Sequence, residues 1–148
     1  MWKVIPPRLV GPYLNGQRSV IAGFVHLARD TLFREPAEAF VALGLGYDGS
    51  EFTPDMAELH YLCWLAKEID DYIPATGPSG PGEAPGGPDL PSSERPALSS
   101  ARVRVIPEFY TSPMPIPVGT ALCRLTATGD EPIARYDGLA WQRQQREA

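Results

Sequence analysis

The stretch PATGPSGPGEAPGGPDLPSSERPALSS, residues 74–100, divides the chain into two parts. It holds seven prolines, five glycines and five serines, and it contains no aromatic residue. Such a composition buries too little apolar surface to offset the entropy that is lost when a backbone becomes ordered. We therefore predict three segments: residues 1–73, a Pro/Gly/Ser-rich linker that is disordered on its own, and residues 101–148.

The two flanking segments are small for independent domains. Residues 1–73 suffice for a marginal domain, whereas a unit the size of residues 101–148 usually needs a partner, a metal ion or disulfides to fold. We therefore expect the two ends to pack on each other, or the C-terminal segment to pack on another subunit. The linker would permit either arrangement, because it spans up to roughly 80–90 Å when fully extended.

Two helices are predicted in the first half of the N-terminal segment. Residues 19–33 carry apolar side chains at helical spacing, although a strand over residues 19–27 is an alternative because of Gly23. Pro36 suits the first turn of a second helix, for which Gly44 would be the stop signal, although residues 40–47 could equally form a strand.

The strongest helix signal covers residues 53–72. Thr53 is a suitable N-cap, and Pro54 suits the first helical turn. Apolar residues then follow in two stripes, and a helix that is apolar on two sides packs on two sides. We predict that one stripe, together with Trp141 from the C-terminal segment, binds a partner protein; its residues are Tyr61, Trp64, Leu65 and Tyr72.

After the linker the apolar period changes to two, which predicts β-strands. The expected strands cover residues 101–110, 120–128, 133–136 and 139–141, with an extended proline-rich run at 111–117 and a turn at Gly129 and Asp130. A short edge strand is also expected at residues 2–5, before Pro6. The predicted fold class is α+β: a helical N-terminal part, a long Pro/Gly-rich connection and a small antiparallel β-sheet at the C-terminus, followed by a polar tail.

The net charge of −5 bears on the choice of partner. An acidic chain without a basic run is a poor candidate for nucleic-acid binding, because phosphate contacts supply most of that affinity. The longest apolar stretch, residues 20–28, is too short and too polar to span a bilayer. No signal-peptide pattern is visible. We therefore expect no nucleic-acid or membrane partner, and an intracellular (cytoplasmic) or virion location.

Residues with reactive or metal-binding side chains are few and scattered. We interpret Cys63 and Cys123 as reduced, buried thiols, with a disulfide between the two halves as the alternative. Two histidines, His26 and His60, are too few for a recognisable metal site. We therefore expect neither a metal ion nor another cofactor.

No catalytic motif emerges, and the sequence favours a protein that is not an enzyme. Asp70 and Asp71 would point about 100° apart on a helix, so they would not form a carboxylate dyad. The glycine-rich residues 44–49 do not match a phosphate-binding loop and predict a flexible turn. If the protein is an enzyme, its site would converge from both halves, with His26, Tyr47, Glu108 and Tyr110 as candidates.

One stretch, from Ile116 to Tyr136, reads IPVGTALCRLTATGDEPIARY and carries a family resemblance. A proline-glycine pair leads into a strand and then into a Thr-Gly turn, through Pro117, Gly119, Thr120, Leu122, Thr126, Thr128 and Gly129. This pattern, about a seventh of the chain, resembles a segment of bacteriophage head-decoration proteins. The resemblance implies a small β-rich body and a role in virion structure, and it assigns a function to no individual residue.

These observations lead to one functional prediction and two alternatives. We predict a structural or accessory subunit of a large protein assembly, such as a phage particle, that binds neighbouring subunits through an extended arm and an apolar helix face. A small enzyme or toxin-like effector with a site between the two halves is one alternative. The other is a regulatory adaptor or inhibitor that binds a basic partner protein through the acidic face of residues 1–73, which carry six basic and ten acidic side chains.

Overall fold

The computed structural model describes residues 1–68, 72–74 and 106–144. Within these residues the chain forms an 8-stranded antiparallel sheet with the strand order β4-β5-β2-β1-β3-β6-β7-β8. The strands are β1 (Trp2–Ile5), β2 (Val20–His26), β3 (Glu58–Cys63), β4 (Ile73–Pro74), β5 (Glu108–Pro115), β6 (Ala121–Thr126), β7 (Gly129–Tyr136) and β8 (Trp141–Arg143). The α-helices are α1 (Pro7–Leu14) and α2 (Pro36–Ala42), and a 3-10 turn, η1, covers Ala28–Asp30.

The α+β prediction is therefore wrong, because the N-terminal part contributes strands to the same sheet as the C-terminal part. Residues 19–33 form no α-helix: they contain β2, which agrees with the alternative of a strand over residues 19–27, followed by the short η1. Ile21 and Val25 are both fully buried on β2. Their spacing of four residues is compatible with a helix and also with one face of a strand, so this spacing alone did not decide between them.

The predicted helix over residues 53–72 is also wrong, because this stretch contains β3. β3 pairs with β1 on one side and with β6 on the other, and both of its faces are buried: Leu59 and Tyr61 lie on one face and Leu62 on the other. A strand buried on both faces has a nearly continuous apolar sequence, which resembles a helix with two apolar stripes. The predicted end of the helix, at residues 69–71, lies outside the described residues.

Local end signals predicted other elements well. α2 begins at Pro36 and ends before Gly44, which adopts a positive φ of 61°. β1 is a strand as expected, although it lies inside the sheet and not at its edge. In the C-terminal part the strands form in the predicted order, but the proline-rich run belongs to β5, and β7 already begins at Gly129, where a turn was expected. Residues 75–105, including most of the linker, lie outside the described part.

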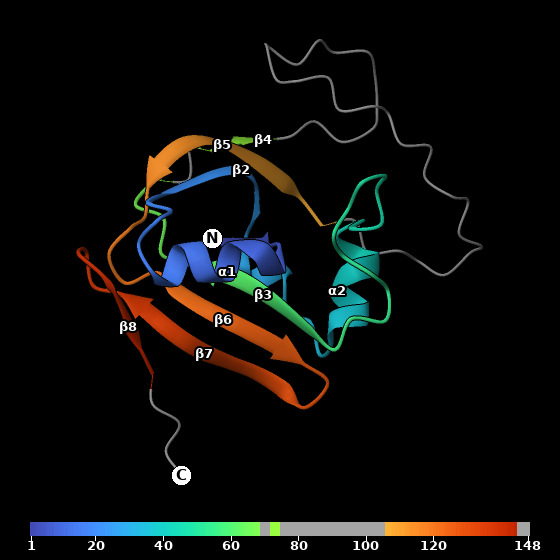
Figure 1. The fold of residues 1–148 in the computed structure, drawn as a ribbon. Helices are drawn as coiled ribbons and strands as arrows, with labels where there is room; N and C mark the ends of the chain where they lie inside the picture. The colour runs from blue at the N-terminus through green and yellow to red at the C-terminus, as the bar shows by residue number, and fades with distance from the viewer. Residues whose placement is uncertain (69–71, 75–105, 145–148) are drawn as a thin grey trace.

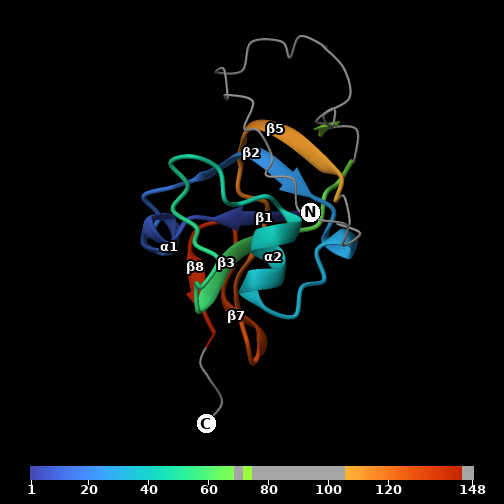
Figure 2. The same ribbon diagram turned by 90° about the vertical axis from the view of Figure 1, so that its right-hand side faces the viewer.

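The sheet curves around α1, which lies between β2 on one side and the β6–β8 strands on the other (Figures 1 and 2). We call this side of the sheet the α1 face. Tyr13 of α1 is fully buried here and packs edge-on against Trp141. A second apolar core lies on the opposite face, the α2 face, where Ala39 of α2 joins Trp2 and Tyr61. The two ends of the chain thus pack on each other, since β5 pairs with β2 and β6 pairs with β3.

The sheet is weakly joined between β1 and β2, which share a single residue pair, Trp2 with His26. The amine of Lys3 on β1 compensates by donating a hydrogen bond to the carbonyl oxygen of Phe24 on β2, at 3.0 Å. Gly23 on β2 adopts a positive φ of 91°, a backbone conformation that favours glycine, whereas a Cβ there would make only an ordinary contact, at 3.6 Å from Lys3 Nζ. Burial, with a smaller contribution from Arg18, lowers the pKa of Lys3 to about 8.

This buried amine makes stability depend on pH. Between the folded-state pKa of about 8 and the ordinary value of 10.5, Lys3 holds more protons in the unfolded chain than in the folded one, so its contribution favours folding increasingly as the pH rises. We expect the free energy of unfolding of the wild type, relative to Lys3→Met, to be higher at pH 9.5 than at pH 7.5 in urea titrations. A difference between the two proteins that does not change with pH would contradict this.

Candidate functional site

The predicted partner-binding stripe does not form a common surface. Tyr61, Trp64, Tyr72 and Trp141 are all buried within the chain. Leu65 is the exception, with 92% of its surface exposed. The indole nitrogen of Trp64 donates to the Tyr72 hydroxyl at 3.0 Å, so these two side chains satisfy each other in the core of the α1 face. Of the five residues, only Leu65 is therefore placed to contact a partner in this conformation.

Three of the four residues considered for an enzyme site come together. His26 on β2 pairs with Glu108 on β5. Two residues further along the same pair of strands, Phe24 pairs with Tyr110, and their rings meet edge to face with 5.8 Å between the ring centroids. Tyr47 lies elsewhere, in the loop between α2 and β3.

The groups around His26 hold its ring in place between two strands. Its Nδ1 lies 3.2 Å from the carbonyl oxygen of Pro107, and its Nε2 lies 3.9 Å from a carboxylate oxygen of Glu108. Burial lowers the pKa of His26, which favours the neutral form of the ring. Both ring nitrogens face groups of the adjoining strand, and the ring packs against the edge of Trp2. The arrangement holds β2 and β5 together, and it leaves the His26 ring itself buried.

The two cysteines are free thiols on neighbouring strands, β3 and β6. Burial raises the pKa of Cys123 to about 11, so this thiol is a poor nucleophile at neutral pH. The glycine-rich stretch ends in a turn, in which Ser50 N donates to Tyr47 O at 3.0 Å. Asp70 and Asp71 lie outside the described residues.

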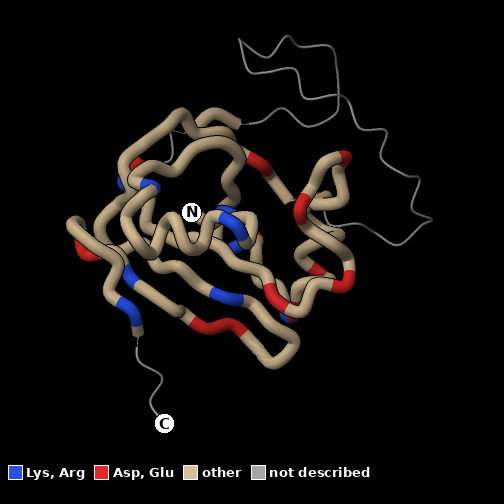
Figure 3. Tube along the Cα trace, in the orientation of Figure 1, with Lys and Arg blue, Asp and Glu red and all other residues tan. Residues whose placement is uncertain are grey.

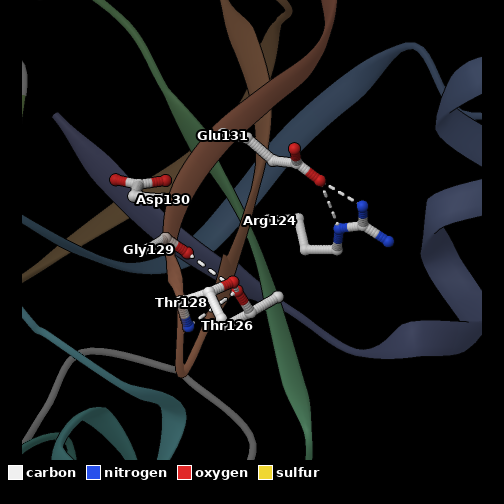
Figure 4. Close-up of a pocket in the computed structure, with 6 residues that line it drawn as sticks. All are labelled: Arg124, Thr126, Thr128, Gly129, Asp130 and Glu131. Atoms are coloured by element: carbon white, nitrogen blue, oxygen red, sulfur yellow. Dashed lines mark hydrogen bonds and ion pairs between the residues drawn. The ribbon is translucent and has the colours of Figure 1, made fainter. Parts of the chain in front are cut away.

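A polar pocket that the sequence did not reveal lies at the closed end of the β6–β7 hairpin (Figure 4). Its volume is about 300 Å³, and it is lined by Arg124, Thr126, Thr128, Gly129, Asp130 and Glu131. The Thr126 hydroxyl donates to the carbonyl oxygen of Gly129, at 3.1 Å, which fixes the turn. Figure 4 shows Glu131 turned toward Arg124, and Asp130 turned to the other side of the strand.

Arg124 is held between two carboxylates. Its Nε donates to Glu131 Oε1 at 2.9 Å, and its Nη1 donates to Glu58 Oε2 at 3.3 Å. The other oxygen of Glu58 lies 3.8 Å from Nε2 of His60. Burial lowers the pKa of His60, so the charged part of this group is one arginine with two glutamates. The sequence could not indicate the group, because Glu58 and Arg124 meet only through the β3–β6 register.

On the opposite side of the hairpin, Asp130 accepts a hydrogen bond from the buried hydroxyl of Tyr61. Burial and this bond raise the pKa of Tyr61. The Tyr61 ring also stacks on Trp2, with 4.8 Å between the ring centroids. Tyr61 therefore connects the central strand of the sheet to the hairpin that carries the pocket.

Removing this hydroxyl should destabilise the fold. We expect Tyr61→Phe to lower the free energy of unfolding by about 1–3 kcal/mol, because a hydrogen bond to a charged group is lost. Tyr47→Phe is the matched control, since half of Tyr47 is exposed (50%) and it should change stability by less than about 0.5 kcal/mol. Urea unfolding of both variants provides the measurement, and equal effects would count against the Tyr61–Asp130 bond.

The most uneven charge distribution lies in residues 35–58, which we call the acidic lobe. It comprises α2 and the loop that leads to β3, and it contains no lysine, arginine or histidine. Its carboxylates are all exposed: Glu35, Glu38, Asp48, Glu51, Asp55 and Glu58. In Figure 3 red bands gather around α2 and the following loop. The composition of this range was visible in the sequence, but its exposure on one lobe required the fold.

No protein-family model, curated protein or solved structure matches the chain. Among the described residues, no helix has the length and apolar character needed to cross a membrane. Within the same residues, His, Cys, Asp and Glu side chains do not gather in a group of three or more that could hold a metal ion.

Proposed function

We propose that this protein is a binding subunit, an adaptor or accessory component of a larger protein assembly, that contacts a basic partner protein through its acidic lobe. The observation that carries the proposal is the set of six exposed carboxylates in residues 35–58, without an intervening basic side chain. Such a potential steers a positively charged partner and repels acidic ones. The lobe takes the place of the apolar helix face, which does not exist in this fold.

Exposed apolar side chains within the lobe support a protein partner. Tyr47 and Val41 are 50% and 53% exposed and lie among the carboxylates. A large aromatic or aliphatic side chain with a charged rim is the usual composition of a protein interface. Small cations would be attracted by the charge alone and would need neither side chain.

The lobe is also held in one conformation, which lowers the entropic cost of binding. Leu45 and Phe52 are buried and pack into the core of the α2 face. Glu51 is anchored by Arg8 of α1, with 2.6 Å between Nε and Oε1. The last carboxylate, Glu58, is shared with Arg124, so the lobe continues into the polar pocket of the β6–β7 hairpin.

The kind of assembly is a separate question. The virion assignment stays a prediction that depends on the stretch from Ile116 to Tyr136, most of which lies in β6, β7 and their hairpin. The proposed extended arm belongs to residues outside the described part. The enzyme alternative finds less support, because His26 and Glu108 face each other across β2 and β5 and not across an accessible pocket.

The acidic lobe can be tested with a basic peptide, deca-lysine, titrated into the full chain and followed by amide chemical shifts. We expect the largest shifts in residues 35–58, and we expect them to weaken at high salt because exposed charges are screened. The variant Glu35→Gln/Asp48→Asn/Asp55→Asn removes three charges that form no ion pair within the described residues, and it should bind about tenfold more weakly.

The control variant Glu83→Gln/Asp89→Asn/Glu94→Gln loses the same charge from the linker sequence and should bind like the wild type. Equal weakening in the two variants would show that the peptide responds to net charge alone. That result would overturn the lobe as the binding surface.

A further inference from the structure

A second cavity lies away from the acidic lobe, between the turn that joins α1 to β2 and the turn that joins β7 to β8. Its volume is about 310 Å³. Several of its walls are apolar or aromatic, and its lining residues are Leu14, Asn15, Gly16, Arg18, Ser19, Ile116, Tyr136, Leu139, Ala140 and Trp141. This volume is at the lower end of the range for small-molecule sites.

Arg18 is the charged residue of this cavity, and the fold fixes it in place. Its backbone N–H donates to Pro12 O at 2.9 Å, and its Nε donates to the Tyr13 hydroxyl at 3.1 Å. The guanidinium carbon lies 5.6 Å from the centre of the Tyr13 ring. The Tyr13 hydroxyl in turn donates to Val20 O, so the buried Tyr13 side chain is itself fixed and holds the Arg18 guanidinium in position. No carboxylate of the described chain forms an ion pair with Arg18, and its terminal nitrogens have no hydrogen-bond acceptor among the described residues.

The rim opposite Arg18 is equally well ordered. The carboxylate of Asp137 accepts hydrogen bonds from the backbone N–H groups of Leu139 and Ala140, both at 2.8 Å, and a third from the side chain of Gln142. These hydrogen bonds lower the pKa of Asp137, and they direct its carboxylate toward the N–H groups of its own turn. Leu139 nevertheless points outward, with 93% of its surface exposed, next to the buried ring of Trp141.

Charge and shape together define the ligand. A guanidinium group presents paired N–H donors that match the two oxygens of a carboxylate. Leu14, Ile116 and Trp141 provide apolar surface for the rest of the molecule.

We propose that this cavity binds a small organic carboxylate with an aromatic or apolar body, and that Arg18 pairs with its carboxylate. The site is independent of the acidic lobe, because the two share no residue. It would give a binding subunit a means of responding to a small acid, or a place for the terminal carboxylate of a peptide.

Benzoate and benzamide form a matched pair of probes, since they have nearly the same shape and differ in charge. We expect benzoate, titrated into the full chain, to shift the amide signals of Gly16 and Ala140 and the indole N–H signal of Trp141, which has no hydrogen-bond partner in the described structure. Benzamide should bind about tenfold more weakly, because it lacks the charge-assisted bonds to Arg18. Equal binding of the two probes, or no shift at these positions, would overturn the proposal.

Variants separate the charge from the cavity. Arg18→Gln should weaken benzoate binding by about tenfold, whereas Arg29→Gln, which removes an exposed arginine outside the cavity, should leave it unchanged. Ala140→Phe keeps Arg18 and fills the cavity, so it should also weaken benzoate binding. Retention of wild-type affinity in Ala140→Phe, with the fold intact by its amide spectrum, would place the ligand elsewhere.

A second ligand, N-acetyl-phenylalanine, distinguishes the two sources of the carboxylate. Tighter binding of N-acetyl-phenylalanine than of benzoate would indicate a peptide terminus, and tighter binding of benzoate would indicate a smaller acid.

Discussion

The pairing of β3 with β6 is the contact on which the rest of the structure depends. It joins strands from the two sides of the linker into a single sheet, with six residue pairs from Glu58 with Thr126 to Cys63 with Ala121. β3 also pairs with β1, so its side chains support both cores: Leu62 on the α1 face and Tyr61 on the α2 face. The Glu58–Arg124 ion pair, the β6–β7 hairpin and its polar pocket all follow from this register.

The sequence predicted those elements whose signals are local. Pro36 and Gly44 delimited α2 correctly, and period-two alternation predicted strands in the C-terminal part, although the bounds of β5 and β7 differ from those expected. The sequence-based prediction was wrong for β3, because a strand that is buried on both faces lacks the polar–apolar alternation that distinguishes a strand from a helix. The charge of residues 35–58 could be read from composition, whereas the group around Arg124 could not, because its members are distant in sequence and meet only through strand register.

The two proposed surfaces differ in how they are built. The acidic lobe consists of a short helix and a long loop, fastened to the sheet by buried side chains such as Phe52. The Arg18 cavity forms where two turns from distant parts of the chain meet, and each turn is fixed by its own side chain, Tyr13 or Asp137. Sequence changes in one surface are therefore expected to leave the other intact, since distant and separately supported sites contribute independently to stability.

The placement of β3 also has a consequence for synthesis of the chain. Strand β3 emerges from the ribosome about sixty residues before its partner β6, and at roughly 5–20 residues per second that interval lasts several seconds. During this time the apolar edge of β3 that later receives β6 has no partner, and such an edge readily pairs with another chain. The long connection thus delays completion of the sheet and lengthens the time in which the unpaired edge of β3 is open to other chains.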